Sequence, residues 1–373
     1  MDTNFSFDLP KNKSNVMKVM GVGGGGSNAV NYMYSQGIKG VDFIVCNTDS
    51  QALEESPVPI KIQLGINLTE GLGAGANPEI GKLAALESYE ELKNLLETQT
   101  KMLFITAGMG GGTGTGGAPV IARIAKDMGI LTVAVVTTPF DTEGDLRAQQ
   151  AREGVGHLTE QVDCLIEINN QKIFEIFPGD AKFIDGFNEV NEIIANAVRG
   201  VANVILNPAT MNVDFADVQA AMSESGVAIM CIGKAKGLNR ASAALTNALN
   251  NPFFDKAEIR NAKGLLVNIC GSSGMKMEEI NQILNEAKNI GLDGIQAIPG
   301  LTIDEAFEDE ISVTIIATGL KKYNPKEFWD DDLHKLKPVK TFVPEIKHEN
   351  DGYINPMDLK KIDIQSVIRS IED

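Results

Sequence analysis

The stretch AGMGGGTGTGGAP, residues 107–119, consists almost entirely of glycine and small hydroxyl residues. An apolar run, KMLFITA, precedes it, and a helical pattern begins near Ala118-Pro119, where proline suits the first turn of a helix. A glycine-rich turn between a strand and a helix lets several backbone N–H groups converge on one point, where the helix dipole adds positive potential. The stretch therefore predicts a phosphate-binding loop rather than a flexible linker. Its candidate residues are Gly110, Gly111, Gly112, Thr113, Gly114, Thr115 and Gly116.

A second loop, GVGGGGSNAV at residues 21–30, also joins a strand to a helix. Taken alone it matches the G-x-G-x-x-G pattern of dinucleotide-binding enzymes. Such an enzyme would need an acidic residue at the end of the second strand, where VDFIVCNTDS has Asn47. A dinucleotide site is therefore the weaker interpretation of this loop.

A third run of small residues, GLGAGANPEIG at residues 71–81, precedes another helix. Three glycine turns that follow strands of one sheet indicate a ligand with several phosphates. The pattern G-x-x-x-x-G-K-[ST] does not occur, so the sequence excludes a P-loop.

The segment MNVDFADV contains three polar residues that could act on a ligand, Asn212, Asp214 and Asp217. The two aspartates are three residues apart, so they share one face if a helical turn begins here. Capping of a helix start is one interpretation. Joint action of the two carboxylates on one target is the other.

The elements that must position these residues alternate short apolar strands with helical segments from residue 16 onward. Such alternation predicts a Rossmann-like α/β fold, in which helices cover both faces of a parallel sheet. Residues 183–206 keep apolar residues at helical spacing for about seven turns, which predicts one long helix ending before Asn207-Pro208. The strands and helices that follow, up to residue 320, predict a smaller mixed α/β domain.

Length, net charge and residue composition limit the classes of function that this chain can have. A chain of 373 residues suggests two domains, and a net charge of -17 repels nucleic acid and anionic lipid. We expect a soluble, cytosolic chain, because no apolar run reaches the length of a signal peptide or a membrane span. The histidines lack ligand spacing, so no protein-ligated metal site is expected. The cysteines are expected to be buried free thiols; they are Cys46, Cys164, Cys231 and Cys270.

The motif GGGTGTG at residues 110–116, with GVGGGG, GAGAN and MNVDFADV in this order, resembles the tubulin/FtsZ GTPase family and its bacterial cell-division branch. The resemblance runs from about Val16 to Leu320. It implies an enzyme that hydrolyses GTP to GDP and phosphate and polymerises head-to-tail into a homopolymer. It also implies the cytoplasm and the mid-cell division ring, with the membrane reached only through adaptor proteins and no nucleic-acid partner.

The resemblance implies a domain order along the whole chain. The segments are a flexible N-terminal segment 1–15, a GTP-binding domain 16–182, a central helix 183–206, a C-terminal domain with the catalytic loop 207–320, a linker 321–358 and an adaptor-binding peptide 359–373.

The resemblance places residues of the first glycine loop and of the loop after the second strand around the phosphates; these are Gly23, Gly24, Gly25, Asn28 and Asn47. It places the GAGAN loop at the γ-phosphate, with Ala74, Gly75 and Ala76. In TPFDTEGDLR, Glu143 matches the ribose-binding glutamate and Arg147 the arginine beside the phosphates and base. Basic residues are usual in the family at the positions of Asp145 and Leu146.

The resemblance places three further residues at the base. Asn170 matches the base-contacting asparagine, Phe187 would stack on guanine, and Glu192 takes the place of the guanine-reading aspartate. A carboxylate accepts hydrogen bonds from the N1 and N2 donors of guanine, which adenine cannot mimic.

In this family the loop with Asn212, Asp214 and Asp217 enters the nucleotide pocket of the next subunit. The acids would position the attacking water and its cation, so hydrolysis would depend on assembly. The implied metal ions are Mg²⁺, held mainly by the nucleotide and water, and a monovalent cation at the subunit interface.

Two other function classes stay open on sequence grounds. A nicotinamide-dependent oxidoreductase would use GVGGGG but leaves GGGTGTG and MNVDFADV unexplained. A tubulin-like filament or nucleotide-binding scaffold, without turnover or outside division, would fit a copy that has diverged at Glu192, Asp145 and Leu146.

The C-terminal segment DLKKIDIQSVIRSIED has four apolar residues at i, i+3, i+4 and i+7 spacing. One interpretation is a peptide that becomes helical in a partner's groove, and the other is a helix docked on its own body. The apolar residues are Ile364, Val367, Ile368 and Ile371.

Overall fold

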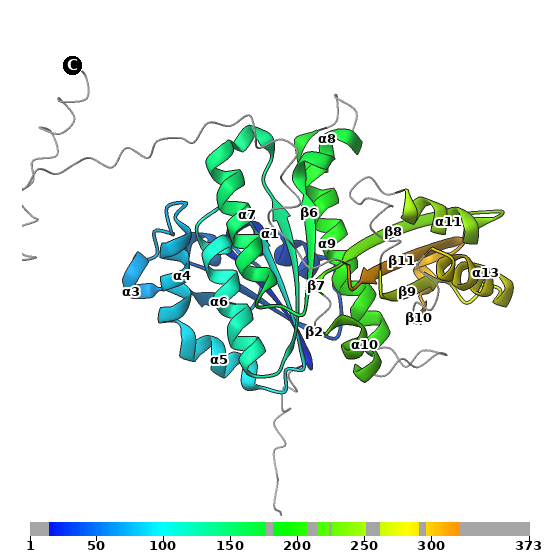
Figure 1. The fold of residues 1–373 in the computed structure, drawn as a ribbon, viewed down its shortest axis with the longest axis horizontal. Helices are drawn as coiled ribbons and strands as arrows, with labels where there is room; N and C mark the ends of the chain where they lie inside the picture. Colours follow the sequence, from blue (N-terminus) through cyan, green and yellow to red (C-terminus); the bar gives the residue numbers. More distant parts are fainter. Residues whose placement is uncertain are drawn as a thin grey trace, which may run out of the picture. The chain divides into compact units, whose positions relative to one another are not determined.

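The computed structural model describes residues 15–176, 182–206, 215–223, 226–250, 262–290 and 296–320 (Figure 1). These residues belong to one compact unit, which spans residues 1–325. None of the helices described is long and apolar enough to cross a lipid bilayer.

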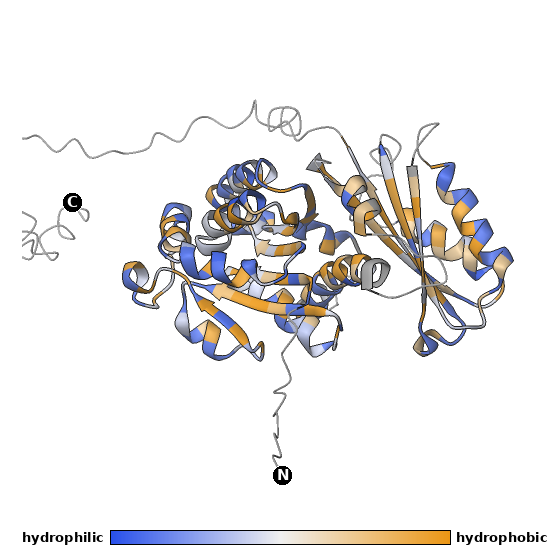
Figure 2. Ribbon diagram, turned by 90° about the horizontal axis from the view of Figure 1, so that it is seen from below, coloured by the Kyte–Doolittle hydropathy of each residue, from blue (hydrophilic) through white to orange (hydrophobic). Residues whose placement is uncertain are grey.

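A seven-stranded sheet forms the centre of the first part of the unit, in the order β3-β2-β1-β4-β5-β6-β7, and every pair of neighbours is parallel. The central strands are almost entirely buried, as expected of parallel strands covered on both faces, and Figure 2 shows them as largely hydrophobic. The strands are β1 Met17–Val22, β2 Val41–Asn47, β3 Ile60–Gln63, β4 Met102–Gly108, β5 Leu131–Thr138, β6 Cys164–Asn169 and β7 Gly226–Val227.

Helices cover both faces of this sheet. Side chains of α1 and α9 share one apolar core with the strand residues on their side, and those of α4 to α7 form a second core on the other side. This arrangement confirms the predicted Rossmann-like fold. The helices are α1 Gly23–Ser35, α2 Ser50–Glu54, α3 Ile66–Thr69, α4 Pro78–Glu87, α5 Tyr89–Glu97, α6 Thr113–Asp127, α7 Asp145–Thr159, α8 Ile173–Ile176 and α9 Phe183–Leu206.

A smaller sheet of four strands follows, in the order β10-β9-β11-β8. β9 and β10 are parallel, whereas β11 runs antiparallel to both of its neighbours, so the sheet is mixed as predicted. Helices α11 and α13 pack on it over a third apolar core. The elements are α10 Phe215–Met222, β8 Ile229–Lys236, α11 Arg240–Leu249, β9 Gly264–Gly271, α13 Met277–Lys288, β10 Gln296–Ile303 and β11 Glu310–Thr318.

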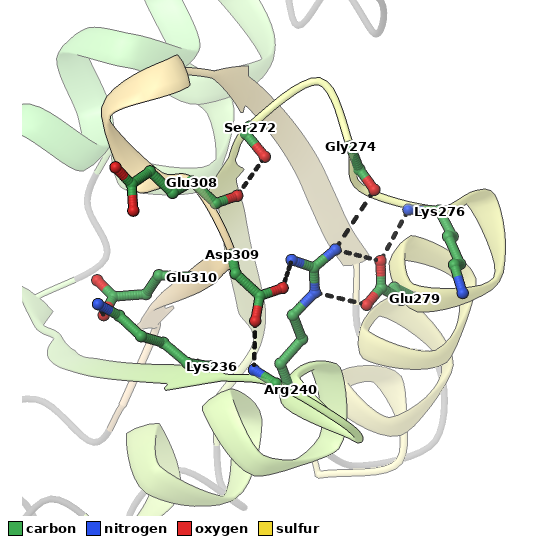
Figure 3. Close-up of polar contacts among 10 residues, drawn as sticks. Lys236, Arg240, Ser272, Gly274, Lys276, Glu279, Glu308, Asp309 and Glu310 are labelled. Carbon is green, nitrogen blue, oxygen red and sulfur yellow. Dashed lines mark hydrogen bonds and ion pairs between the residues drawn. The ribbon is translucent and has the colours of Figure 1, made fainter.

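A buried arginine joins three loops at one end of the smaller sheet (Figure 3). Arg240 donates from Nε and NH2 to both oxygens of Glu279, at 2.7 and 3.0 Å, and from NH1 to Oδ1 of Asp309 at 2.9 Å. The second Asp309 oxygen accepts the backbone N–H of Gly237 at 3.0 Å. We call these three side chains the Arg240 cluster; it fastens the β8–α11 turn to the first turn of α13 and to the turn before β11.

Two details predicted from the sequence are wrong, the start of one helix and the element that precedes one loop. Helix α6 begins at Thr113, not near Ala118-Pro119, because the glycines before Pro119 already take part in helix packing. The loop GLGAGAN follows the short helix α3 rather than a strand, since β3 ends at Gln63.

Candidate functional site

A pocket of about 500 Å³ opens at the carboxyl ends of β1, β4, β5 and β6. β1 and β4 are neighbours in the sheet, and the strand order changes direction between them, since β2 and β3 lie on the β1 side and β5 to β7 on the β4 side. In open α/β sheets such a switch point leaves a crevice that binds ligands. The pocket is lined by Gly24, Gly25, Gly108, Met109, Gly111, Gly112, Thr113, Gly114, Thr137, Thr138, Pro139, Phe140, Thr142, Glu143, Arg147, Asn170, Phe174 and Phe187.

Glycines let the two predicted phosphate loops meet across this crevice. Gly23 has φ +71°, and a Cβ there would lie 2.8 Å from the backbone nitrogen of Gly114. A Cβ on Gly25 would lie 3.2 Å from the Cα of Gly108. Side chains at these positions would separate the loops, so the close approach explains why both are glycine-rich.

Two helices begin at the pocket, α1 from the loop after β1 and α6 from the loop after β4. Neither has an acidic residue in its first turn, so their N-terminal partial charges are not neutralised there. Among the lining residues Arg147 is the one basic side chain, and its NH1 already donates to Oε2 of Glu143. An anion would therefore be held mainly by backbone and helix dipoles.

Both hydroxyls of the GGGTGTG motif already have hydrogen-bond partners in the protein. Thr113 Oγ1 lies 2.7 Å from Thr48 Oγ1, and Thr115 Oγ1 accepts the N–H of Gly110 at 2.9 Å. Thr113 lines the pocket, whereas Thr115 does not. The hydrogen bond of Thr115 to Gly110 stabilises the conformation of the loop.

Three aromatic rings also line the pocket. The Phe140 ring lies 5.4 Å from the Phe174 ring and 5.6 Å from the Phe187 ring, at interplanar angles of 63° and 71°. Asn170 is 8% exposed, and its Oδ1 has no hydrogen-bond partner among the described residues. A buried, unpartnered oxygen beside three rings suits a planar ligand that carries hydrogen-bond donors.

The structure brings half of the predicted ligand-binding residues into this pocket. Those that line it are Gly24, Gly25, Gly111, Gly112, Thr113, Gly114, Glu143, Arg147, Asn170 and Phe187.

The other predicted residues lie beside the pocket or away from it. Asn28 is exposed on α1, Asn47 is buried at the end of β2, and the exposed Gly75 and Ala76 follow the buried Ala74 in the loop before α4. Gly116 serves packing, because a Cβ there would lie 1.8 Å from the carbonyl oxygen of Pro78 on α4.

Glu192 does not line the pocket, contrary to its expected place at the base. Its Oε2 accepts the Tyr32 hydroxyl of α1 at 2.9 Å. Its Oε1 accepts Asn196 Nδ2 at 3.1 Å and Arg199 NH1 at 3.4 Å. The carboxylate therefore faces α1, with both oxygens already hydrogen-bonded.

The predicted catalytic residues cannot be placed at the pocket. Asn212 and Asp214 lie outside the described residues, and Asp217 falls within α10.

Several lining residues were not singled out from the sequence. The segment Thr137–Phe140 covers the end of β5 and the two residues after it, and its position could have been inferred because β5 pairs with β4 and ends at the same sheet edge. Phe174, on the short helix α8, gave no comparable sequence signal.

Comparison with known proteins identifies the family. The model of the Tubulin/FtsZ family GTPase domain matches residues 16–178, and that of the FtsZ family C-terminal domain matches residues 226–321. Cell division protein FtsZ of Buchnera aphidicola subsp. Baizongia pistaciae is 44% identical over 347 residues, covering 92% of this chain and 90% of that protein. FtsZ of Pseudomonas putida is 47% identical over 316 residues, covering 84% and 79%. A solved FtsZ dimer from M. jannaschii is 40% identical, with a TM-score of 0.78 over 84% of this chain and 90% of that one. The chain therefore belongs to the FtsZ branch of the tubulin/FtsZ GTPase family.

Proposed function

We propose that the pocket binds GTP, with the phosphates between the β1–α1 and β4–α6 loops and guanine among Phe140, Phe174 and Phe187. The chain is a tubulin-like GTPase of the FtsZ type. The observation that carries the proposed pose is the composition of the pocket lining, which combines two helix N-termini with an aromatic cluster.

Asn170 is our candidate for reading the base. Its Oδ1 is buried without a partner, so a donor on the ligand would relieve the cost of burying it. Guanine offers N1–H and N2–H donors on one edge, whereas adenine places an acceptor at N1. The expected preference is therefore for guanine nucleotides.

Glu143 and Arg147 also line the pocket and are proposed to contact the ribose and the phosphates. Glu143 Oε1 accepts the N–H of Phe140 at 2.8 Å while Oε2 accepts from Arg147. This pairing holds the Arg147 guanidinium at the pocket, where its positive charge favours an anionic ligand.

We propose that a neighbouring subunit completes the catalytic site with Asn212, Asp214 and Asp217. Glu143 is the one carboxylate among the lining residues, and both of its oxygens are already hydrogen-bonded. The described lining thus offers no free carboxylate to orient a water at the phosphate end, which favours delivery of that group from outside.

Head-to-tail assembly into filaments is the arrangement that such a shared site requires. A solved FtsZ from M. jannaschii is a dimer, which supports self-association for this chain. Mg²⁺ would be held mainly by the phosphates and water, and a monovalent cation would lie at the interface. The described residues contain no group of three or more acidic, histidine or cysteine side chains suited to a metal ion.

The remaining assignments rest on family membership. We propose the domain limits given above, a cytoplasmic mid-cell ring as the location, and residues 359–373 as an adaptor-binding peptide; these residues lie outside the described part of the chain. Deleting residues 359–373 should abolish adaptor-dependent membrane recruitment and leave GTP hydrolysis intact. Loss of hydrolysis in that truncation would contradict the proposal.

Equilibrium binding to dilute protein tests the pocket assignment. GDP should bind at least 100-fold tighter than ADP or NAD, because a site built to hydrogen-bond a donor rejects ligands that lack it by large factors. Asn170→Ala should remove most of that preference. Equal binding of GDP and ADP by the parent chain would contradict the proposal.

A further inference from the structure

Two threonine hydroxyls meet at the start of α6, and one of them lines the pocket. Thr48 Oγ1 and Thr113 Oγ1 are 2.7 Å apart, and either hydroxyl can donate to the other. Thr113 is the first residue of α6 and lines the pocket, whereas Thr48 directly follows β2, is 0% exposed and does not line it. Thr48 therefore reaches the pocket through the Thr113 hydroxyl.

The backbone around Thr48 fixes the place of its side chain. The Thr48 carbonyl oxygen accepts the N–H of Gly73 and the hydroxyl of Thr69, both at 3.3 Å. The next residue, Asp49, caps α2 by accepting two backbone N–H groups with its side chain. Thr48 is thus fastened both to the segment before α4 and to α2, and its buried hydroxyl is held facing Thr113.

The direction of the bond between the two hydroxyls decides what Thr113 offers to a ligand. A threonine hydroxyl carries one hydrogen, so it donates once while its oxygen can also accept. If Thr113 donated to Thr48, it would present only lone pairs to the pocket, and the Thr48 hydrogen would have no other acceptor among the described residues. If Thr48 donates to Thr113, the Thr113 hydrogen stays available for an acceptor in the pocket.

An anionic ligand selects the second direction. Thr113 lies in the first turn of α6, where backbone N–H groups and the helix dipole favour a negative charge. An ionised phosphate oxygen accepts hydrogen bonds and needs a donor from the protein. Hydrogen bonds in a chain polarise and strengthen one another, so a Thr113 hydroxyl that already accepts from Thr48 is the stronger donor.

We propose that Thr48 is a positioning residue for phosphate binding. Its buried hydroxyl donates to Thr113 and thereby directs the Thr113 hydrogen towards a phosphate oxygen of the nucleotide. Thr48 acts without touching the ligand, since it is fully buried and lies outside the pocket lining. This inference rests on the proposed binding of guanine nucleotide in the pocket.

The test compares GDP with guanosine, which has the same base and ribose but no phosphate. Thr48→Val keeps the branched shape of the side chain and removes the hydroxyl. In dilute, unassembled protein it should weaken GDP binding by about 3- to 10-fold, a part of what a hydrogen bond to a charged group contributes. Guanosine affinity, read from competition with labelled GDP, should stay unchanged. Thr48→Ser keeps the hydroxyl and should bind GDP as tightly as the parent chain.

A double-mutant cycle shows whether the two hydroxyls act as one chain. Thr113→Val removes the donor itself and should weaken GDP binding by about 10-fold or more. Adding Thr48→Val should weaken binding no further, because no hydroxyl is left for Thr48 to orient. Thermal stability gives a second readout. Thr113→Val leaves the buried Thr48 hydroxyl without its partner, so the double variant should unfold at a higher temperature than Thr113→Val alone.

Thr132→Val is the matched control at the opposite edge of the sheet. Thr132 is 0% exposed near the start of β5, and its hydroxyl donates to the carbonyl oxygen of Ile130 at 2.9 Å. This variant also removes one buried, hydrogen-bonded hydroxyl, so it should lose stability. Because the pocket lies at the other ends of the strands, its GDP and guanosine affinities should match those of the parent chain.

Unchanged GDP affinity in Thr48→Val would overturn the proposal, and so would an equal loss of GDP and guanosine affinity, because either result would show a purely structural contact. Additive losses in the double variant would overturn it as well, since they would show that the two hydroxyls act independently. A parent chain that binds no guanine nucleotide would refute the proposed function instead, so the two failures are distinguishable.

Discussion

The nucleotide pocket and the end of the smaller sheet that holds the Arg240 cluster, here called the tip, are built in opposite ways. The pocket is shaped by backbone, with glycines at its loops and one basic side chain in its lining. The tip is held by side chains, because Arg240 links Glu279 and Asp309 from separate segments. A region that must receive a ligand leaves its backbone accessible, whereas a region that must stay closed satisfies its polar groups internally.

The largest effect should come from the two acids that we propose a neighbouring subunit contributes. Asp214→Ala or Asp217→Ala should lower GTP turnover by about 10²-fold or more, as when one preorganised electrostatic group is removed. GDP affinity of the monomer should stay unchanged, because these side chains would serve the neighbouring subunit. Parallel losses of affinity and turnover would place the acids in their own subunit's pocket.

Breaking the Arg240 cluster should damage the tip and spare the pocket. Arg240→Met leaves the carboxylates of Glu279 and Asp309 without their shared cation and should lower the free energy of unfolding by about 2 kcal/mol. This figure is below the usual cost of breaking a buried pair because the Asp309 side chain is 69% exposed. Denaturant unfolding measures the loss, and GDP affinity of the folded variant should match the parent chain. A change in affinity would show that the two regions are coupled.

Two glycines of the GGGTGTG motif sharpen the comparison, because Gly111 lines the pocket and Gly116 lies outside its lining. A Cβ on Gly116 would meet the α4 backbone at Pro78 and Lys82, so Gly116→Ala should cost about 1 to 3 kcal/mol of stability by overpacking. Gly111 lines the pocket and has open space around it, so Gly111→Ala should fold with near-parental stability and weaken GDP binding. Equal stability of the two variants would contradict this division of roles.

The smallest expected effect is on the loss of folding stability at acidic pH. The hydrogen bonds from Arg240 lower the pKa of Glu279, with burial opposing the shift. A carboxyl with a lowered pKa contributes stability that is fully present above its unfolded value, near 4.5, and lost as pH falls through the lower folded value. Between pH 5 and 3 the parent chain should therefore lose more stability than Glu279→Gln does. Identical pH profiles would remove Glu279 from the acid response.

Local sequence patterns predicted much of the fold. The strand Val41–Asn47 and the long helix Phe183–Leu206 agree with the predicted limits, because their apolar periodicity is strong and their ends carry clear stop signals. The start of α6 was misplaced because glycine has low intrinsic helix propensity, whereas close packing against α4 stabilises the helical turn that contains Gly116.

The site was less predictable where it depends on contacts between distant residues. The glycine-rich loops that line the pocket could be singled out because glycine spacing is a local signal. One oxygen of Glu192 accepts the hydroxyl of Tyr32, 160 positions away, and no local pattern reports that bond. For the same reason the Arg240 cluster was not predicted, since its members lie on three separate segments.

Hydrolysis at a site shared between subunits is tested most directly by the rate of phosphate release per subunit, measured with light scattering across a dilution series at saturating GTP. We predict a specific activity near zero in dilute protein that rises steeply once scattering reports assembly. A specific activity that stays constant from the most dilute sample through the onset of scattering would contradict a shared site, because it would show that each subunit carries a complete catalytic centre.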